Sequence, residues 1–253
     1  MRIDIGAAAS TAWALFKRDR DVLLVVAGTF IFVPALAMLL FLPPPPPTFA
    51  AGASPAEVEL WMNGYIAWLT RCLPWLAISG VSAMFGSLTI TAMYLDAGRP
   101  DVGGAMRVAA RLFPRYFFLM LGVSAVTLVA TALLVLPGLF VMGRTMLVES
   151  ALVAQPASRD GPIARSIDLT RGNSLVLAGL AGIGTFGAQL LASPFMSVDE
   201  ALRAGPAANP IAISLADGGA AAVAATVALA MILIRVAIYR EVTAPRSGPK
   251  IGM

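Results

Sequence analysis

The sequence has no histidine and a single cysteine, Cys72, among its 253 residues. Without imidazole, histidine-based metal sites and every catalytic triad or dyad that needs a histidine base are excluded. One cysteine cannot form an internal disulfide. No two acidic residues share a metal-ligand spacing inside an apolar segment. We therefore expect no catalytic centre, no metal site and no cofactor in this chain.

Charged residues are also scarce, at 13% of the chain, whereas hydrophobic residues make up 58% and the mean hydropathy is +0.83. A soluble domain has about 25% charged residues. So few charges do not cover a water-exposed surface, and the composition predicts an integral membrane protein. One helical bundle accommodates all the apolar segments, so we expect an all-α, polytopic membrane domain over residues 1–253.

Six apolar segments are visible in the sequence. A membrane crossing needs about 20 apolar residues. Five segments reach that length, and the fourth, with only 16 residues, follows the turn signal Pro137-Gly138. The third and fourth segments are therefore predicted to form a tight helical hairpin. The six predicted spans are residues 22–42, 73–95, 116–136, 139–154, 174–196 and 211–239.

The positive charges predict how the chain is oriented. Of the 18 lysine and arginine residues, 15 lie on alternate connections, counting Arg235 with the C-terminal end. The other connections carry Arg71 and Arg203, and Arg144 lies inside a segment. Short loops rich in lysine and arginine stay in the cytoplasm. This pattern predicts six crossings of a bacterial inner (plasma) membrane with both termini cytoplasmic, and it explains the net charge of +4 without nucleic acid.

An internal repeat precedes the odd-numbered spans. Residues 2–18 and 99–115 are identical at 8 of 17 positions, and a weaker third copy begins at Arg159. Asp4 and Asp101 are placed as helix N-caps. The repeat predicts interfacial amphipathic helices before spans 1, 3 and 5.

Basic residues in the repeat copies are candidate contacts for anionic lipid headgroups. In the second copy, Val102 begins an apolar stripe expected to enter the acyl boundary, and the arginines line another face at intervals of four. Basic clusters of this kind bind anionic lipids, although plain anchoring of the bundle would produce the same pattern. The candidate contacts are Arg107, Arg111, Arg115, Arg165 and Arg171.

The remaining connections carry helix-start and anchoring signals. The proline run 43–47 predicts a stiff exit from the first span. Ser54, followed by Pro55 and Glu57, is a predicted N-cap, and a capping-box pattern at Ser197 predicts a short helix that ends near 205–206. Trp61, Tyr65 and Trp68 follow at helical spacing, as in membrane-interface belts.

Small residues recur in the fifth and sixth segments. Glycines at 179, 182, 184 and 187, and an alanine-rich stretch from Gly218, indicate close helix packing. Such packing serves either an internal helix pair or a homo-oligomer, and a membrane-protein partner also stays open.

The fourth segment holds two charges, Arg144 and Glu149. Five helical residues separate their directions by roughly 140°, so they are poorly placed to pair with each other. Arg144 can extend toward the interface, whereas Glu149 must face the bundle and be protonated or partnered. Three interpretations stay open. Glu149 is part of a proton, cation or substrate site, or it is a structural group, or the hairpin is shallow and places Glu149 near the inner face of the membrane. The expected structural partners are Ser124, Thr127, Thr131, Thr145 and Ser150.

One stretch of the sequence resembles a known family. Pro137-Gly138, then Arg144, then the run 161–173 (GPIARSIDLTRGN) resembles the membrane domain associated with bacterial glycerophosphodiester phosphodiesterases and the related uncharacterised inner-membrane proteins of the YciC and DUF975 type. The resemblance implies a six-span membrane fold. It does not carry over a hydrolase activity, because in the phosphodiesterases that chemistry belongs to a separate soluble domain. Ser150 and Gln155 stand where the family often has proline and glutamate, and Glu149 is additional.

These observations support three functional hypotheses. The first is an inner-membrane protein without its own catalytic centre that organises lipid or partner proteins. The second is a small transporter or channel-like protein that uses Glu149. The third, a membrane-embedded enzyme acting on lipid, lacks a catalytic set of residues. A polar cavity at Glu149 would favour the second hypothesis, and a sealed bundle the first.

Overall fold

The computed structural model describes residues 3–43, 46, 49, 52–204 and 209–244. Helices dominate this part, which confirms the predicted all-α bundle. They are α1 (Ile5–Ala27), the π-helical turn η1 (Gly28–Phe32), α2 (Val33–Phe41), α3 (Pro55–Leu95), α4 (Val102–Leu133), α5 (Val135–Thr145), α6 (Val148–Ala154), α7 (Gly161–Leu169), α8 (Ser174–Ala204) and α9 (Pro210–Thr243).

Six helical stretches are long and apolar enough to cross a membrane, so the chain is a multi-pass membrane protein. They are Ile5–Phe41, Pro55–Leu95, Val102–Leu133, Val135–Ala154, Ser174–Ala204 and Pro210–Thr243. Many large apolar side chains on these helices are exposed, such as Leu128 and Leu136, at 71% and 78%. Such a surface requires an apolar surrounding.

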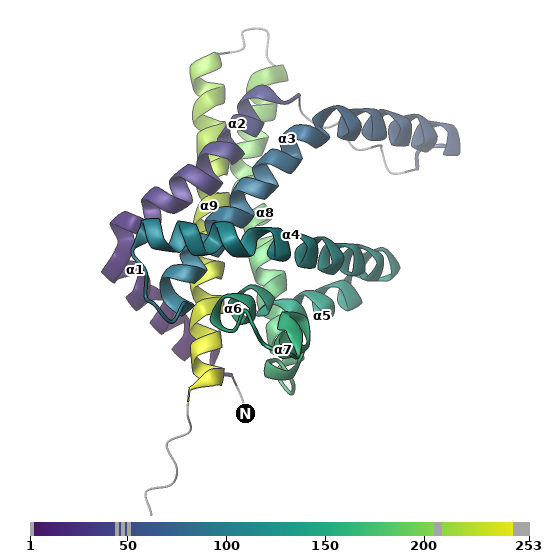
Figure 1. Cartoon of the computed structure of the whole chain (residues 1–253). Coiled ribbons are helices and arrows are strands. Elements are labelled where there is room, and N and C mark those ends of the chain that lie inside the picture. The colour runs from purple at the N-terminus through teal and green to yellow at the C-terminus, as the bar shows by residue number, and fades with distance from the viewer. Residues whose placement is uncertain (1–2, 44–45, 47–48, 50–51, 205–208, 245–253) are drawn as a thin grey trace, which may run out of the picture.

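Helices α8 and α9 run side by side, and α1 and α2 pack along α9 (Figure 1). Helix α4 runs across this group in the view of Figure 1, and α5 packs against both α4 and α8. The first half of α3 projects away from the other helices. The start of α1 and the end of α9 lie together, because the Asp4 backbone N–H donates to Glu241 Oε1 at 3.3 Å. We call this the terminal end of the molecule.

The predicted helix starts are largely correct. Asp4 and Asp101 cap α1 and α4, with side chains that accept from the N–H groups of Ala7 and Gly104. Ser54 begins α3 in a capping box with Glu57. The helix start predicted at Ser197 is wrong, because Ser197 lies inside the continuous helix α8. The predicted end of that helix near 205–206 lies outside the described residues. Parts of the proline run, together with Arg2, Arg246 and Lys250, lie outside it as well.

The amphipathic segments of the repeat join the spans in different ways. In α1 the backbone kinks at Asp19, so its first part is set at an angle to the span. Helix α4 continues through Pro114 without such a break, and only the third copy gives a separate helix, α7. The apolar stripe of α4 does not face lipid as expected. Ala109 is fully buried and Phe113 packs against the cluster around Leu88, so the stripe covers other helices.

The hairpin turn between α4 and α5 lies earlier than predicted. The chain leaves helical geometry at Leu134, and Pro137 and Gly138 lie in the first turns of α5. Proline is accepted at the start of a helix, where backbone donors lack partners. Gly138 is needed for another reason, since a Cβ there would overlap the side chain of Thr131.

Close helix packing occurs at only some of the predicted small residues. A Cβ at Gly184 would lie 2.9 Å from Met231 Cε, whereas Gly179 and Gly218 face open space. The tightest backbone approach is at Gly143, where a Cβ would lie 2.6 Å from the backbone nitrogen of Ala178. Gly143 therefore allows α5 to cross α8 closely, next to the candidate site.

Candidate functional site

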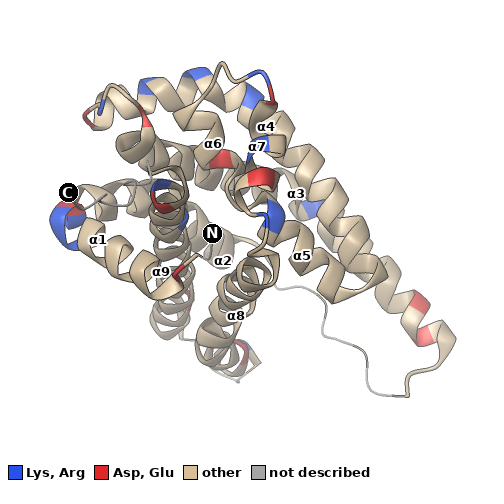
Figure 2. Cartoon of the chain, turned by 90° about the horizontal axis from the view of Figure 1, so that it is seen from below, with Lys and Arg blue, Asp and Glu red and all other residues tan. Residues whose placement is uncertain are grey.

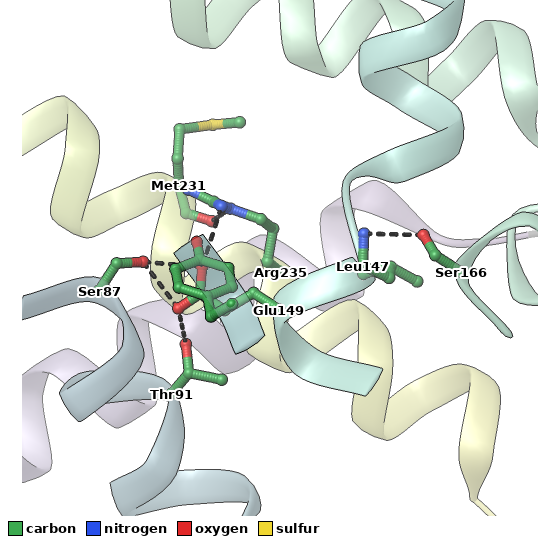
Figure 3. Close-up of polar contacts among 8 residues, drawn as sticks. Ser87, Thr91, Leu147, Glu149, Ser166, Met231 and Arg235 are labelled. Carbon is green, nitrogen blue, oxygen red and sulfur yellow. Dashed lines mark hydrogen bonds and ion pairs between the residues drawn. The ribbon is translucent and has the colours of Figure 1, made fainter. Parts of the chain in front are cut away.

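An interruption between α5 and α6 positions Glu149. The chain leaves α5 after Thr145 and resumes as α6 at Val148. The Ser166 hydroxyl accepts from the Leu147 N–H at 3.2 Å (Figure 3). It also donates to the Arg144 carbonyl at 2.8 Å, so it satisfies backbone groups that the interruption frees. Thr170 Oγ1 lies 3.4 Å from the same carbonyl. Both hydroxyls belong to the run 161–173. In this structure that run stabilises the interruption between α5 and α6.

Glu149 accepts hydrogen bonds from three hydroxyl groups on two other helices (Figure 3). Ser87 Oγ lies 2.8 and 2.9 Å from the two carboxylate oxygens, and Thr91 Oγ1 lies 2.8 Å from Oε1. Tyr116 Oη lies 2.9 Å from Oε2. The residue is only 4% exposed. A carboxylate with this many donors is well stabilised without solvent.

Arg235 of α9 completes this group. Its Nη1 lies 3.5 Å from Glu149 Oε2, and its Nε donates to the Met231 carbonyl at 3.2 Å. Within the described part of the chain the guanidinium has no other hydrogen-bond partner, and its side chain is 28% exposed. A guanidinium carries five N–H donors. The carboxylate is therefore saturated, whereas the guanidinium keeps donors that are free to bind something else.

A cavity of about 650 Å³ leads to this ion pair. Its inner end is the buried Glu149 beside Arg235, and at its mouth stand exposed residues such as Leu128. Apart from those two residues, its lining is apolar with scattered hydroxyls, contributed by α4, α5, α8 and α9. The polar lining residues other than the pair are Tyr116, Ser124, Thr127, Thr131, Thr145 and Thr185.

Three threonine hydroxyls of the cavity bond within their own helices, whereas the Tyr116 hydroxyl donates to Glu149. Thr127, Thr131 and Thr145 each donate at 2.8 Å to a carbonyl four residues earlier in their own helix. Their protons are thus used locally, as is common for threonine in membrane helices. The cavity offers acceptors along its wall and a cationic group at its end.

Glu149 does accept from hydroxyls on neighbouring spans, as predicted, but the individual residues predicted as its partners are wrong. Thr145, Ser150, Ser124, Thr127 and Thr131 do not bond to it, and all except Ser150 line the cavity instead. Arg144 does not pair with Glu149, as expected from the helix geometry. Its Nη1 donates to Ser174 Oγ at 3.1 Å.

Sequence reasoning missed the four actual partners. Ser87 and Thr91 are spaced at i and i+4 in an apolar segment, which places two hydroxyls on one helix face and was a usable signal. Arg235 had been counted with the C-terminal charges, yet it lies inside α9 with its side chain turned to Glu149.

The candidate lipid-binding arginines lie on two segments, with Arg107, Arg111 and Arg115 on α4 and Arg165 and Arg171 on or just after α7. Arg107, Arg111, Arg115 and Arg171 are exposed, and Arg115 Nη1 contacts the Pro156 carbonyl. Arg165 is partly buried, and its Nε has no hydrogen-bond partner in the described structure. Seen from the terminal end, the basic residues are spread over several helices (Figure 2).

A second buried acid, Asp217, was not predicted. It is 3% exposed, and its Oδ2 lies 3.0 Å from Arg203 Nη2. Arg203 also binds Asp199, at 2.7 Å, one turn earlier in α8. This group joins α8 to α9 far from the terminal end.

Among the described residues, no group of three or more cysteine, aspartate or glutamate side chains is arranged to hold a metal ion. Comparison of the chain with protein-family models, with curated proteins and with solved structures gives no match. The features of the molecule that bear on its function are therefore the cavity and the Glu149–Arg235 pair.

Proposed function

We propose that this membrane protein binds an anionic, lipid-like amphiphile in the cavity and organises lipid without a catalytic centre of its own. The observation that carries the proposal is the cavity's inner end, where Arg235 keeps unpaired N–H donors beside a saturated carboxylate. A carboxylate or phosphate headgroup would accept from those donors. The apolar walls would hold the attached chain.

The size and position of the cavity support an amphiphile. Small-molecule sites are commonly about 300–1,000 Å³ with mostly apolar walls and a few polar groups, and this cavity is about 650 Å³. Its mouth carries exposed apolar residues such as Leu128, on a surface that requires an apolar surrounding. We infer that the ligand enters laterally from the bilayer, and that its hydrocarbon tail stays in the lipid while its headgroup enters the cavity.

The orientation in the membrane is part of the proposal. The bias of basic residues favours an inner membrane with both termini in the cytoplasm. Arg235 lies eight residues before the end of α9 at Thr243, so its headgroup site would lie toward the cytoplasmic leaflet. Kinship with the membrane domain of the phosphodiesterases stays a prediction. It agrees with a lipid-related role.

A binding experiment with matched probes tests this function. Purified protein in a mild detergent is titrated with a medium-chain fatty acid and with the fatty alcohol of the same length. The acid should bind more tightly than the alcohol. Arg235→Gln should remove this preference by lowering the affinity for the acid about tenfold, the effect of losing one hydrogen bond to a charged group. Ala224→Phe, at the cavity mouth, should weaken both probes, whereas the control Ala222→Phe, an exposed residue of α9 that does not line the cavity, should change neither. Equal binding of acid and alcohol by the parent protein would refute the proposal.

Transport is a second candidate, because the cavity reaches an intramembrane carboxylate. A polar cavity at Glu149 would have favoured transport, but the walls of this cavity are mostly apolar. The threonine protons that are used within their own helices argue against a proton path along the cavity wall. Proteoliposomes with an entrapped pH dye distinguish the two. Proton flux that Glu149→Gln abolishes would favour transport, and absence of flux together with acid-selective binding would favour the lipid role.

A further inference from the structure

A second recess lies at the terminal end, apart from the cavity of the proposed function. It has a volume of about 700 Å³ and lies between the ends of α3 and α9, the middle of α1 and the end of α6. Three arginines from three segments of the chain line it, Arg18, Arg99 and Arg240. Asp96 is the one acidic residue in the lining. The recess therefore carries an excess of positive charge.

Tyr94, which is 7% exposed, holds two of these arginines in place. Arg18 lies over one side of its ring at 5.9 Å and Arg240 lies 5.5 Å from the ring centre, both within the range of cation–π attraction. Arg240 Nη2 also donates to the Tyr94 carbonyl at 2.7 Å. The Tyr94 hydroxyl donates to Asp19, which pairs with Arg18 at 2.8 Å. The two cationic groups are thus oriented by a buried ring before any ligand arrives.

Arg99 adds a third charge that the fold does not otherwise use. Its side chain has no hydrogen bond or ion pair within the described residues, and its backbone adopts a φ of 44°, a conformation that favours glycine. Arg18 and Arg99 both repel Arg240 electrostatically. Two acidic neighbours offset part of this charge, because Asp19 pairs with Arg18 and Asp96 lines the recess, where its Oδ2 accepts from the Gly98 N–H at 2.9 Å. Three guanidinium groups beside two carboxylates leave one positive charge in excess.

We propose that this recess binds a phosphate group through Arg18, Arg99 and Arg240. Guanidinium groups that converge from different segments match the several oxygens of a phosphate and relieve their mutual repulsion when it binds. Gln155, which also lines the recess, is an additional donor. The phosphate belongs either to a phospholipid headgroup or to a soluble phosphate compound, since the same chemistry serves both.

The test uses full-length protein in a neutral detergent, titrated with inorganic phosphate and with short-chain phosphatidic acid. Arg99→Gly is the most informative variant. It removes the charge and also relieves the unfavourable backbone conformation, so the melting temperature should stay unchanged or rise while phosphate affinity falls by about fivefold to tenfold. Arg240→Gln should weaken binding similarly. Arg159→Gln removes an exposed arginine between α6 and α7, outside the recess, and serves as the matched control.

Each outcome decides the question. Binding of both probes that weakens in Arg99→Gly and Arg240→Gln supports a site for phosphate itself, open to soluble compounds. Binding of phosphatidic acid alone, with the same sensitivity, supports a headgroup site. The proposal is overturned if neither probe binds, or if Arg159→Gln weakens binding as much as Arg99→Gly. It is also overturned if only Arg235→Gln weakens binding, because that result would place the lipid in the other cavity.

Discussion

Two buried carboxylates, Glu149 and Asp217, lie in apolar helices of this protein and differ in how they are satisfied. They are 4% and 3% exposed, and each lies near an arginine. Glu149 accepts from three neutral hydroxyls on α3 and α4, with Arg235 more distant at 3.5 Å. Asp217 depends on Arg203 at 3.0 Å, and that arginine is shared with Asp199.

This difference indicates which of the two carboxylates contributes more to the stability of the fold. The hydroxyls around Glu149 come from helices far apart in sequence, so the carboxylate ties α3, α4 and α6 together, and its removal leaves several buried donors unpaired. Removal of Asp217 leaves an arginine that still has a partner. A buried charge is costly mainly when its partner is lost. Stability measurements on the two sites should therefore differ clearly.

The largest effect is expected for Glu149→Leu. This change leaves the hydroxyls of Ser87, Thr91 and Tyr116 without an acceptor and Arg235 without its counter-charge, which should cost about 3 kcal/mol of unfolding free energy. Glu149→Gln keeps the shape and an acceptor oxygen and should cost about 1 kcal/mol. Unfolding in mixed detergent measures both. Glu149→Leu more stable than the parent would show that the contacts contribute nothing and that the charge is kept for activity.

Tyr116→Phe should have the next largest effect. The ring stays buried, and only the hydroxyl that donates to Glu149 Oε2 is lost. A hydrogen bond to a charged group contributes about 1.5–3 kcal/mol, and the low end applies because Ser87 and Arg235 still contact the same oxygen. Tyr65→Phe, on the projecting part of α3, is the matched control and should change stability little. An equal loss in both variants would contradict a specific role for the Glu149 contact.

The two sites also differ in how far the sequence predicted them. An acid in the middle of an apolar segment identifies Glu149 and predicts that it faces the bundle. Of its partners only Tyr116 belongs to the same hairpin, whereas Ser87, Thr91 and Arg235 come from α3 and α9, which only the three-dimensional packing brings next to it. The spacing of Ser87 and Thr91 was the one signal available in the sequence.

Asp217 was missed because it lies near the start of an apolar segment, where a charge is unremarkable. Its partner Arg203 was predicted to lie in a separate short helix that begins at Ser197. In the structure α8 continues through that capping-box pattern, so Asp199 and Arg203 lie one turn apart on one helix. Capping residues predict a helix start only where the preceding chain is not already helical. The N-caps Asp4, Ser54 and Asp101 follow non-helical residues, and those predictions were correct.

Asp217→Leu is expected to have a smaller effect than Tyr116→Phe. Leucine keeps the branched shape of the aspartate side chain, and Arg203 keeps Asp199 at 2.7 Å. Replacing a buried ion-pair member by a well-packed apolar residue is often close to neutral, so the expected cost is about 1 kcal/mol or less. The same unfolding assay measures it. A loss as large as that of Glu149→Leu would remove the distinction between the two carboxylates.

Asp199→Asn should have the smallest effect of all when made alone. Asp199 and Arg203 are an i, i+4 pair on α8, partly exposed at 18% and 32%, and such pairs contribute about 0.5 kcal/mol. Asp217 remains to hold the arginine. In the double variant with Asp217→Leu, however, Arg203 loses both acidic partners, so the combined loss should exceed the sum of the single losses by about 1 kcal/mol. A double-mutant cycle measures this excess directly. Strict additivity would mean that the two acids do not share Arg203 energetically. The contribution of Asp217 to stability would then be independent of Asp199.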